Sequence, residues 1–461
     1  MSAGRTVAIV GGGLAGLAAG CALADRGFRI ELFERKPFLG GRASSYEHPG
    51  TGEVIDNCQH VLLGCCTNLL DLYGRIGVVD RVRWYDRLTF IEPGGARSQI
   101  APTFLPAPLH SAPSFFRARA LTVRDKLSIA RAMLALMPRL PADDGAASFA
   151  TWLQRHGQTP AAISRFWQPV LVSALNEELD RVSVSSAALV FRDAFLKSAE
   201  AGRMGLPAMP LSQLYAHAGE YIRQHGGSVH LRSSANSVAV ERDRVRVCVG
   251  GAEYSVDYAV LAVPFRALDS LLPNSEQFAA LRQSASHLET APITGVHLWF
   301  DRQITELDHA VLLDRTIQWM FHKSRILGRD GNGSYVELVI SSSKSLVEKS
   351  RQEVLEMALR ELGEFFPAVR EASVIKTAVV KEVHATFVPG PGSDQHRPGN
   401  RTDFERLFIA GDWTATGWPA TMEGAVRSGY MCAESLLTMA GDSGRVLVPD
   451  LPARGFMRLF A

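Results

Sequence analysis

The stretch that decides the fold reads Val7-Ala8-Ile9-Val10-Gly11-Gly12-Gly13-Leu14-Ala15-Gly16. An apolar run typical of a buried strand meets a glycine turn, and a helix is expected over residues 17–26. Gly11 permits the tight turn, Gly13 lets a pyrophosphate approach the main chain, and Gly16 lets helix and strand pack closely. The phosphate would then lie at the positive end of the helix. The pattern therefore predicts a dinucleotide-binding βαβ unit.

A second strand and a second pair of glycines follow this turn. The strand at residues 30–33 ends in Glu34, and an acid about 20 residues beyond the glycines accepts the ribose 2′-hydroxyl in such units. The next turn holds Gly40-Gly41-Arg42. Its glycines allow close approach, and a guanidinium can donate two parallel hydrogen bonds to a phosphate. We interpret the turn as a second phosphate contact, with a surface turn and a solvated arginine as the alternative.

Near the other end of the chain, another glycine motif follows an apolar strand. Residues 406–413 contain the pair Gly411-Asp412, and residues 417–429 lead into a helix that is expected to begin near Met422. Main-chain N–H groups at a helix N-terminus stabilise negative charge. This segment is therefore a second candidate for contact with the same cofactor.

These segments together resemble flavoproteins of the amine oxidase and phytoene desaturase type. In that family Gly-Gly-Arg reaches the FAD phosphates, the Asp of Gly-Asp meets the ribityl–pyrophosphate region, and the helix start faces the flavin pyrimidine edge. The resemblance implies FAD as the cofactor, with Val238 as a main-chain contact to adenine or, alternatively, an ordinary sheet valine. The FAD contacts that it implies are Gly11, Gly13, Leu14, Ala15, Gly16, Glu34, Arg35, Gly41, Arg42, Ala43, Val238, Gly411, Asp412, Thr421, Met422 and Ala425.

The fold class predicted from these motifs is α/β. We expect a discontinuous FAD-binding dinucleotide fold with an inserted substrate domain of mixed helix and sheet. The FAD-binding pieces are expected at residues 1–85, 205–290 and 383–437. The substrate-domain pieces are expected at residues 86–204, which look largely helical, and 291–382, where strands precede a helix at residues 345–362. Residues 438–461 are expected to form a C-terminal tail.

Composition narrows the function classes. The chain has 461 residues, of which 46% are hydrophobic, and a formal net charge of +2. This near-neutral charge argues against nucleic acid as a partner. The six cysteines and the scattered histidines have no metal-ligand spacing, so we predict free thiols in a reducing compartment and no metal site. A second dinucleotide fingerprint is missing, which argues against a dedicated NADPH domain. The sequence has no uncharged apolar run of about 18 residues, so we predict no membrane-spanning helix.

One stretch, residues 102–141, combines apolar and basic side chains, and Asp125 is its only acid. Such a segment suits docking to an anionic membrane surface. The alternative is an amphipathic helix with one face in the core and one in solvent. The family resemblance favours the membrane, which implies a cytoplasmic protein that is peripheral to the inner face of the cell membrane.

A dense polar run follows the second phosphate turn and reads Asp56-Asn57-Cys58-Gln59-His60. Most flavoproteins of this class carry a more apolar loop there. With the Gly-Gly-Arg turn and residues 411–429, the run resembles the squalene-associated FAD-dependent desaturase-like family of hopanoid biosynthesis, whose members include hydroxysqualene dehydroxylase. The resemblance extends over essentially the whole chain.

That resemblance implies a reaction in which hydride from reduced FAD replaces the hydroxyl of hydroxysqualene and gives squalene. It also implies upstream squalene-synthase-like enzymes as partners. The departing hydroxyl needs an acid, for which His60 and Asp56 are the candidates. Alternatively, Asp56 fixes the loop and His60 satisfies a buried carbonyl.

Three other functions stay open. The first is a carotenoid or phytoene-type desaturase, which would share the fold and the apolar tunnel. An amine oxidase is weakened because residues 292–297, where that class typically carries a lysine, have none. The third is a non-catalytic flavin-fold protein that binds isoprenoids, against which the intact Glu34, Arg42 and Asp412 argue.

Overall fold

The glycine turn lies at the centre of a five-stranded parallel sheet. The computed structural model describes residues 5–138, 147–273, 275–329, 331 and 333–460. The strand order is β10-β2-β1-β14-β20, and every neighbouring pair is parallel. The sheet is therefore built from three segments that are distant in the sequence, which confirms the predicted discontinuous dinucleotide fold. The strands are β1 (Thr6–Val10), β2 (Arg29–Phe33), β10 (Ser228–His230), β14 (Tyr258–Leu261) and β20 (Leu407–Ile409).

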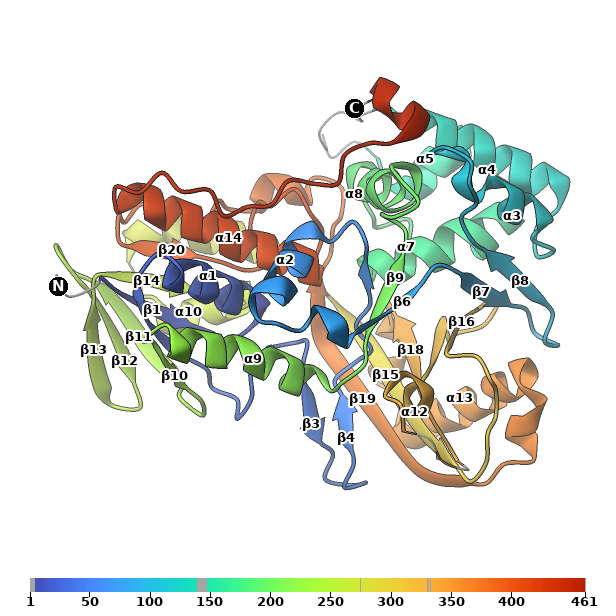
Figure 1. Ribbon diagram of the computed structural model, residues 1–461, viewed down its shortest axis with the longest axis horizontal. Helices are drawn as coiled ribbons and strands as arrows, with labels where there is room; N and C mark the ends of the chain where they lie inside the picture. The colour runs from blue at the N-terminus through green and yellow to red at the C-terminus, as the bar shows by residue number, and fades with distance from the viewer. Residues whose placement is uncertain (1–4, 139–146, 274, 330, 332, 461) are drawn as a thin grey trace.

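Helices cover one face of this sheet and a small antiparallel sheet covers the other (Figure 1). Alternate residues of β1 divide between the two layers, because Val7 and Ile9 pack with the helices while Ala8 and Val10 pack with the small sheet. The helices are α1 (Leu14–Ala24), α2 (Thr67–Arg75), α9 (Leu211–Gln224) and α14 (Met422–Met439), and the small sheet has β11 (Ala235–Val240), β12 (Val245–Val249) and β13 (Ala252–Val256). Two further helices are α10 (Leu268–Leu271) and α11 (Ala279–Ser286).

A seven-stranded mixed sheet forms the centre of the inserted domain, in the order β19-β15-β18-β17-β16-β7-β8. Helix α13 (Arg351–Phe365) packs against one face through an apolar cluster that includes Val296, Leu338 and Leu362. The other face is left to line the candidate site described below. The strands are β7 (Leu88–Ile91), β8 (Arg97–Ile100), β15 (Thr290–Phe300), β16 (His309–Leu312), β17 (Trp319–His322), β18 (Ser334–Ser341) and β19 (Val374–Phe387).

A helical group forms the end of the molecule that lies away from the N-terminus (Figure 1). Its apolar cluster includes the fully buried Trp167 and Phe191. The C-terminal turn at Gly455–Phe460 packs here, because the Phe456 N–H donates to the Ala107 carbonyl at 2.8 Å. The helices are α3 (Ala112–Arg117), α4 (Val123–Ala135), α5 (Phe149–Arg155), α6 (Pro160–Ala162), α7 (Gln168–Leu175) and α8 (Val184–Leu189), with π-helical turns at Ile163–Trp167 and Val190–Leu196.

Short elements connect the two main sheets. Strands β3 (Ser45–Glu47) and β4 (Val54–Asp56) form a hairpin, while β5 (Leu62–Leu63), β9 (Met204–Pro207) and β6 (Val82–Tyr85) form a three-stranded sheet. Helix α12 (Lys323–Ile326) directly follows β17. Within the described residues, no helix has both the length and the apolar character needed to cross a bilayer.

Most expected elements are found, with shifted ends. The helix expected at residues 345–362 begins only at Arg351, because Ser350 and Glu353 form a capping box: the Ser350 Oγ accepts from the Glu353 N–H, and the Glu353 carboxylate accepts from the Ser350 N–H. The strands expected before this helix are also found, and the first of them, β15, begins at Thr290.

Gly429 allows α14 to lie against α1. A Cβ at this position would lie 2.3 Å from the Ala15 carbonyl oxygen and 2.8 Å from the Ala18 Cβ. We therefore expect Gly429→Ala to lower the free energy of unfolding by about 1–3 kcal/mol, the usual cost of overpacking. Urea unfolding measures this. Gly74→Ala in α2 is the matched control, since its Cβ would meet nothing within 4 Å, and alanine should stabilise that helix slightly. Equal effects of both substitutions would contradict the packing argument.

Candidate active site

The glycine turn leaves its main chain open where a phosphate would lie. Gly11 has φ +112°, and a Cβ there would lie 2.3 Å from the Ala262 carbonyl oxygen. A Cβ on Gly16 would lie 2.0 Å from the Gly11 carbonyl oxygen. Gly13, in contrast, has as its nearest neighbour the Gly41 Cα, at 3.9 Å from an ideal Cβ. Gly13 is also the N-cap of α1 and provides no side chain to satisfy the first helical N–H groups. The turn therefore fits a pyrophosphate.

Glu34 is buried at the end of β2 and bridges two main-chain segments. Its Oε2 accepts from the Gly12 N–H at 2.8 Å, and its Oε1 accepts from the Lys36 N–H at 2.8 Å. Each carboxylate oxygen can accept a further hydrogen bond. Glu34 can therefore hold the turn and accept from a ribose hydroxyl at the same time.

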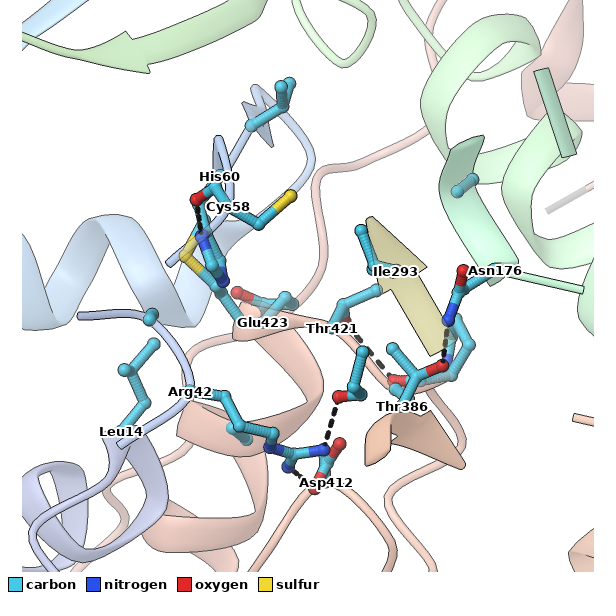
Figure 2. A pocket seen from close by; sticks show the side chains of 18 of the residues that line it. Leu14, Arg42, Cys58, His60, Asn176, Ile293, Thr386, Asp412, Thr421 and Glu423 are labelled. Carbon is cyan, nitrogen blue, oxygen red and sulfur yellow. Dashed lines mark hydrogen bonds and ion pairs between the residues drawn. The ribbon is translucent and has the colours of Figure 1, made fainter. Parts of the chain in front are cut away.

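Arg42 and Asp412 form an ion pair between the two ends of the chain. The Arg42 Nη2 lies 2.5 Å from the Asp412 Oδ1, and its Nη1 donates to the Ala385 carbonyl at 2.8 Å (Figure 2). Both residues line one cavity. A guanidinium has five N–H donors, so Arg42 retains donors that can reach a phosphate.

The start of α14 is fixed beside this ion pair. The Thr421 Oγ1 accepts from the Gly424 N–H at 3.0 Å and caps the helix. The buried Glu423 carboxylate accepts from the Leu69 N–H at 2.8 Å and from the Arg427 Nε at 2.7 Å. It thereby also caps α2, which has no side-chain cap of its own. The N-terminus of α14 is thus held rigidly toward the cavity.

The cavity has a volume of about 470 Å³ and two unlike parts. One part is lined by Gly13, Leu14, Ala15, Glu34, Arg35, Gly41, Arg42, Ala43, Gly411, Asp412, Thr421, Met422 and Ala425, all of which the sequence analysis names. The other part is largely apolar and comes from the helical group, the seven-stranded sheet and β9, with Leu88, Phe90, Val170, Leu189, Phe195, Met204, Ile293, Val311, Trp319, Phe321 and Val339. Asn57, Cys58, Gln59 and His60 also line the cavity.

Four of the residues named from sequence are not on the cavity wall. Gly11 and Gly16 shape the turn from within. Val238 is fully buried in the small sheet, where it pairs with Val247. Asp56 lies behind the polar loop. This geometry does not test an adenine contact at Val238, so that role stays a prediction.

His60 lines the cavity with one ring nitrogen held by its own loop. Its Nδ1 lies 2.7 Å from the Cys58 carbonyl oxygen, so Nδ1 carries the proton and Nε2 is left to titrate (Figure 2). Burial lowers the pKa of His60 below its ordinary value and outweighs the Cys58 carbonyl and the Asp56 charge, which act to raise it; the Arg42 and Lys323 cations act in the same direction as burial. His60 is therefore a neutral imidazole at neutral pH.

Asp56 belongs to a buried charged cluster. Its Oδ1 accepts from the Ser45 Oγ at 2.6 Å, and its Oδ2 accepts from the Lys323 Nζ at 2.6 Å. Burial acts to raise the pKa of Asp56, but the Lys323 ammonium and the hydrogen bonds from Ser45 and the Leu211 N–H together outweigh it, and the pKa falls below its ordinary value. Asp56 therefore stays ionised behind the cavity wall. This geometry favours the alternative in which Asp56 fixes the loop over direct proton transfer.

Sequence reasoning missed three residues at this site. Lys323 and Glu337 join Asp56 from the inserted domain. Asn176, which lines the cavity at the end of α7, donates to the Thr386 Oγ1 at 2.9 Å and to the Ala291 carbonyl at 3.1 Å (Figure 2). Lys323 is 267 positions from Asp56, so no local pattern points to their contact. All six cysteines are free, and no group of three or more potential metal ligands occurs within the described residues.

Comparisons with known proteins agree with this geometry. A family model described as flavin containing amine oxidoreductase matches residues 14–437. A probable zeta-carotene desaturase of Synechococcus elongatus is 26% identical over 94% of this chain and 98% of its own. A 15-cis-phytoene desaturase of Narcissus pseudonarcissus is 27% identical over 94% and 80% of the two chains. The solved structure of putrescine oxidase bound to putrescine has a TM-score of 0.73, 17% identity and coverage of 95% and 99%. The cofactor is FAD.

Glu34 should contribute directly to FAD affinity. We expect Glu34→Ala to weaken FAD binding by about 1–3 kcal/mol, the scale for a lost hydrogen bond to a charged partner. Flavin fluorescence titration measures this. Glu31→Ala is the control, because Glu31 lies on the same strand and contacts His230 instead of the cavity. Unchanged flavin affinity in a folded Glu34→Ala variant would remove Glu34 from the site.

Glu337 should make stability depend on pH. Burial, helped by Asp56 and opposed by Lys323, raises the pKa of Glu337 from 4.5 to about 8. Between these values the folded chain keeps a proton that the unfolded chain releases. The free energy of unfolding therefore falls as pH rises, by at most about 1.4 kcal/mol per pH unit. Urea unfolding at pH 6 and 7.5 should show a shallower decline for Glu337→Gln. The exposed control Glu348→Gln should keep the wild-type slope, and identical slopes in all three proteins would contradict the assignment.

Proposed function

The chain belongs to the flavin-containing amine oxidoreductases, and we propose that it exchanges hydride with a long isoprenoid chain. The observation that carries this proposal is the apolar part of the cavity, which continues directly from the FAD motifs. Trp319, Phe321 and Val339 on the sheet line this part together with Val170 and Leu189 on the helices. Such a lining binds a hydrocarbon by burying apolar area.

Desaturation is the reaction that the relatives support. Their names are zeta-carotene desaturase and 15-cis-phytoene desaturase, and they match over 94% of this chain. FAD supplies a hydride acceptor when oxidised and a hydride donor when reduced. Removal of a hydride from a saturated carbon pair also releases a proton. A neutral His60 on the cavity wall suits the role of proton acceptor.

Reductive removal of the hydroxyl of hydroxysqualene is the second candidate, and the polar loop favours it. Asn57, Gln59 and His60 bring hydrogen-bonding groups to the same cavity as its largely apolar part, which suits a substrate with one oxygen atom. In this reaction His60 must donate a proton, and its lowered pKa opposes this near neutral pH. The rate would then rise as the pH falls. Desaturation with His60 as base would instead become faster as the pH rises.

Anaerobic stopped-flow absorbance of the flavin distinguishes the two reactions. Desaturation predicts bleaching of oxidised enzyme by phytoene or zeta-carotene. Dehydroxylation predicts reoxidation of photoreduced enzyme by hydroxysqualene, with squalene as the product. In the active direction, we expect His60→Ala to retain FAD and to be about 10²–10⁴-fold slower, the usual contribution of a general acid or base. The control is His217→Ala, on the exposed side of α9. No flavin response to any of these isoprenoids would contradict the proposal, and a wild-type rate in His60→Ala would return His60 to a structural role.

We also propose that the helical group docks to an anionic membrane. Phe104, Val123 and Leu134 are exposed by 95%, 70% and 64%. Leu459 in the C-terminal turn adds a further 80% exposed side chain beside this stretch. Exposed apolar groups with neighbouring arginines fit the inner face of the cell membrane. Residues 139–141 of the stretch lie outside the described residues.

Liposome co-sedimentation tests this docking. Replacing Arg117, Arg119 and Arg124 with Gln should reduce binding to vesicles that contain phosphatidylserine, at about 1 kcal/mol per well-placed basic residue. The reduction should be larger at low salt, where screening is weakest. The control replaces Arg242, Arg244 and Arg246, which are exposed near the β11–β12 turn. Equal loss in both triple variants would indicate general attraction by net charge instead of a docking surface.

A further inference from the structure

Lys323 is a buried lysine at the boundary between the FAD-binding fold and the inserted substrate domain. It is the first residue of α12, and its side chain is 2% exposed. Its ammonium donates to the Asp56 Oδ2 at 2.6 Å and to the Gln59 Oε1 at 2.7 Å. The third neighbour is the Glu337 Oε2 on β18, at 3.7 Å. One cation therefore contacts the first FAD-binding segment and the substrate-domain sheet at the same time.

Gln59 connects Lys323 to the polar loop, residues 57–60, that lines the cavity. Its Oε1 accepts from Lys323, and its Nε2 donates to the His60 carbonyl oxygen at 3.0 Å. The His60 ring in turn hydrogen-bonds through Nδ1 to the Cys58 carbonyl at 2.7 Å. These bonds form a continuous series from the buried ammonium to the imidazole that lines the cavity. Gln59 holds the main chain of His60, and the Cys58 carbonyl of the same loop holds the ring nitrogen that carries the proton.

We propose that Lys323 and Gln59 are positioning residues that set the orientation and tautomer of His60. Neither the nucleotide turn nor the ion pair between Arg42 and Asp412 involves Lys323 in a hydrogen bond or salt bridge within the described residues. FAD binding should therefore survive the loss of this series. Only the kinetic consequence rests on the proposed function, because the state of the His60 ring can be observed without substrate.

The hydrogen bonds around Asp56 and Lys323 determine which variants test the positioning of His60 without a large loss of stability. Asp56 retains hydrogen bonds from the Ser45 Oγ and the Leu211 N–H when Lys323 is removed. A single Lys323 substitution would still leave buried Asp56 without its cation, which is strongly destabilising in general. Gln59→Leu avoids that problem because it leaves the pair of Asp56 and Lys323 intact. It removes one acceptor of the Lys323 ammonium together with the bond that leads to His60.

Gln158 provides a matched control in the helical group. Its Nε2 donates to the Ser128 carbonyl at 2.7 Å, and its Oε1 accepts from the Trp167 Nε1 at 2.7 Å. This side chain therefore makes the same two kinds of bond as Gln59, away from the cavity wall. Gln158→Leu reports the general cost of losing a bridging amide.

The experiment is ¹⁵N NMR of histidine-labelled holoprotein, with the His60 signals assigned by their loss in His60→Ala. In the wild type we expect a neutral ring with the proton on Nδ1. In Gln59→Leu we expect mixed tautomers and hydride transfer slowed by about 10²-fold, the scale of an ångström-sized misplacement, while FAD affinity changes less than twofold. The double variant Asp56→Asn with Lys323→Met should show the same His60 signature without leaving a buried charge unpaired.

Two results overturn the proposal: His60 signals in Gln59→Leu that match the wild type, or identical changes in Gln59→Leu and Gln158→Leu. A changed His60 signature with an unchanged rate of hydride transfer would uphold the positioning and contradict the chemical role of His60. Failure of the proposed function is thereby distinguished from failure of this inference.

Discussion

The ion pair between Arg42 and Asp412 is the contact on which the candidate site depends. Its two residues are 370 positions apart, and each follows a glycine motif that the main chain needs for close approach. The pair brings the Gly40-Gly41 turn against the strand β20 end of the sheet. Helix α14 begins further along the same segment, at Met422, where the Thr421 cap and the buried Glu423 fix the N-terminus that faces the cavity. A single cofactor can then contact segments from both ends of the chain.

A second charged contact, made by Lys323, joins distant segments at the substrate side of the cavity. Lys323 joins the polar loop of the FAD-binding fold to the inserted sheet. The sheet face is thereby divided: Ile293, Val339 and Phe321 line an apolar cavity, while Glu337 and Lys323 lie next to them in a buried polar cluster. The reacting end of a hydrocarbon substrate would thus lie beside a rigid polar loop. Insertion of the substrate domain into the chain thus brings Lys323 to the loop, where we propose that it positions the His60 imidazole.

The sequence predicts what local chemistry determines. The Gly11 turn and the position of Glu34 directly after a strand depend on neighbours within a few residues, and they are found where the patterns indicate. The start of α13 at Arg351 also has a local signal that the expected range of 345–362 did not use, because Ser350 and Glu353 have capping-box spacing. Arg42 and Asp412 were both identified, but their pairing required the fold.

The remaining features could not be predicted because they depend on long-range packing. Lys323 looks like an ordinary lysine after an apolar strand until β17 places it beside Asp56. The order of the seven-stranded sheet, with β7 and β8 joined to β16 from more than 200 residues away, has no local signal either. The absence of lysine from residues 292–297 concealed the fact that α12, which directly follows β17, brings a buried ammonium to the loop.

The central claim is that one cavity holds FAD on its glycine side and an isoprenoid on its apolar side. A crystal structure of the holoprotein with a bound C30 or C40 isoprenoid tests this most directly. We predict density for the pyrophosphate at Gly13 and the start of α1, the flavin ring between Met422 and His60, and the isoprenoid against Trp319 and Phe321. Flavin density elsewhere, or an isoprenoid bound outside these residues, would contradict the account.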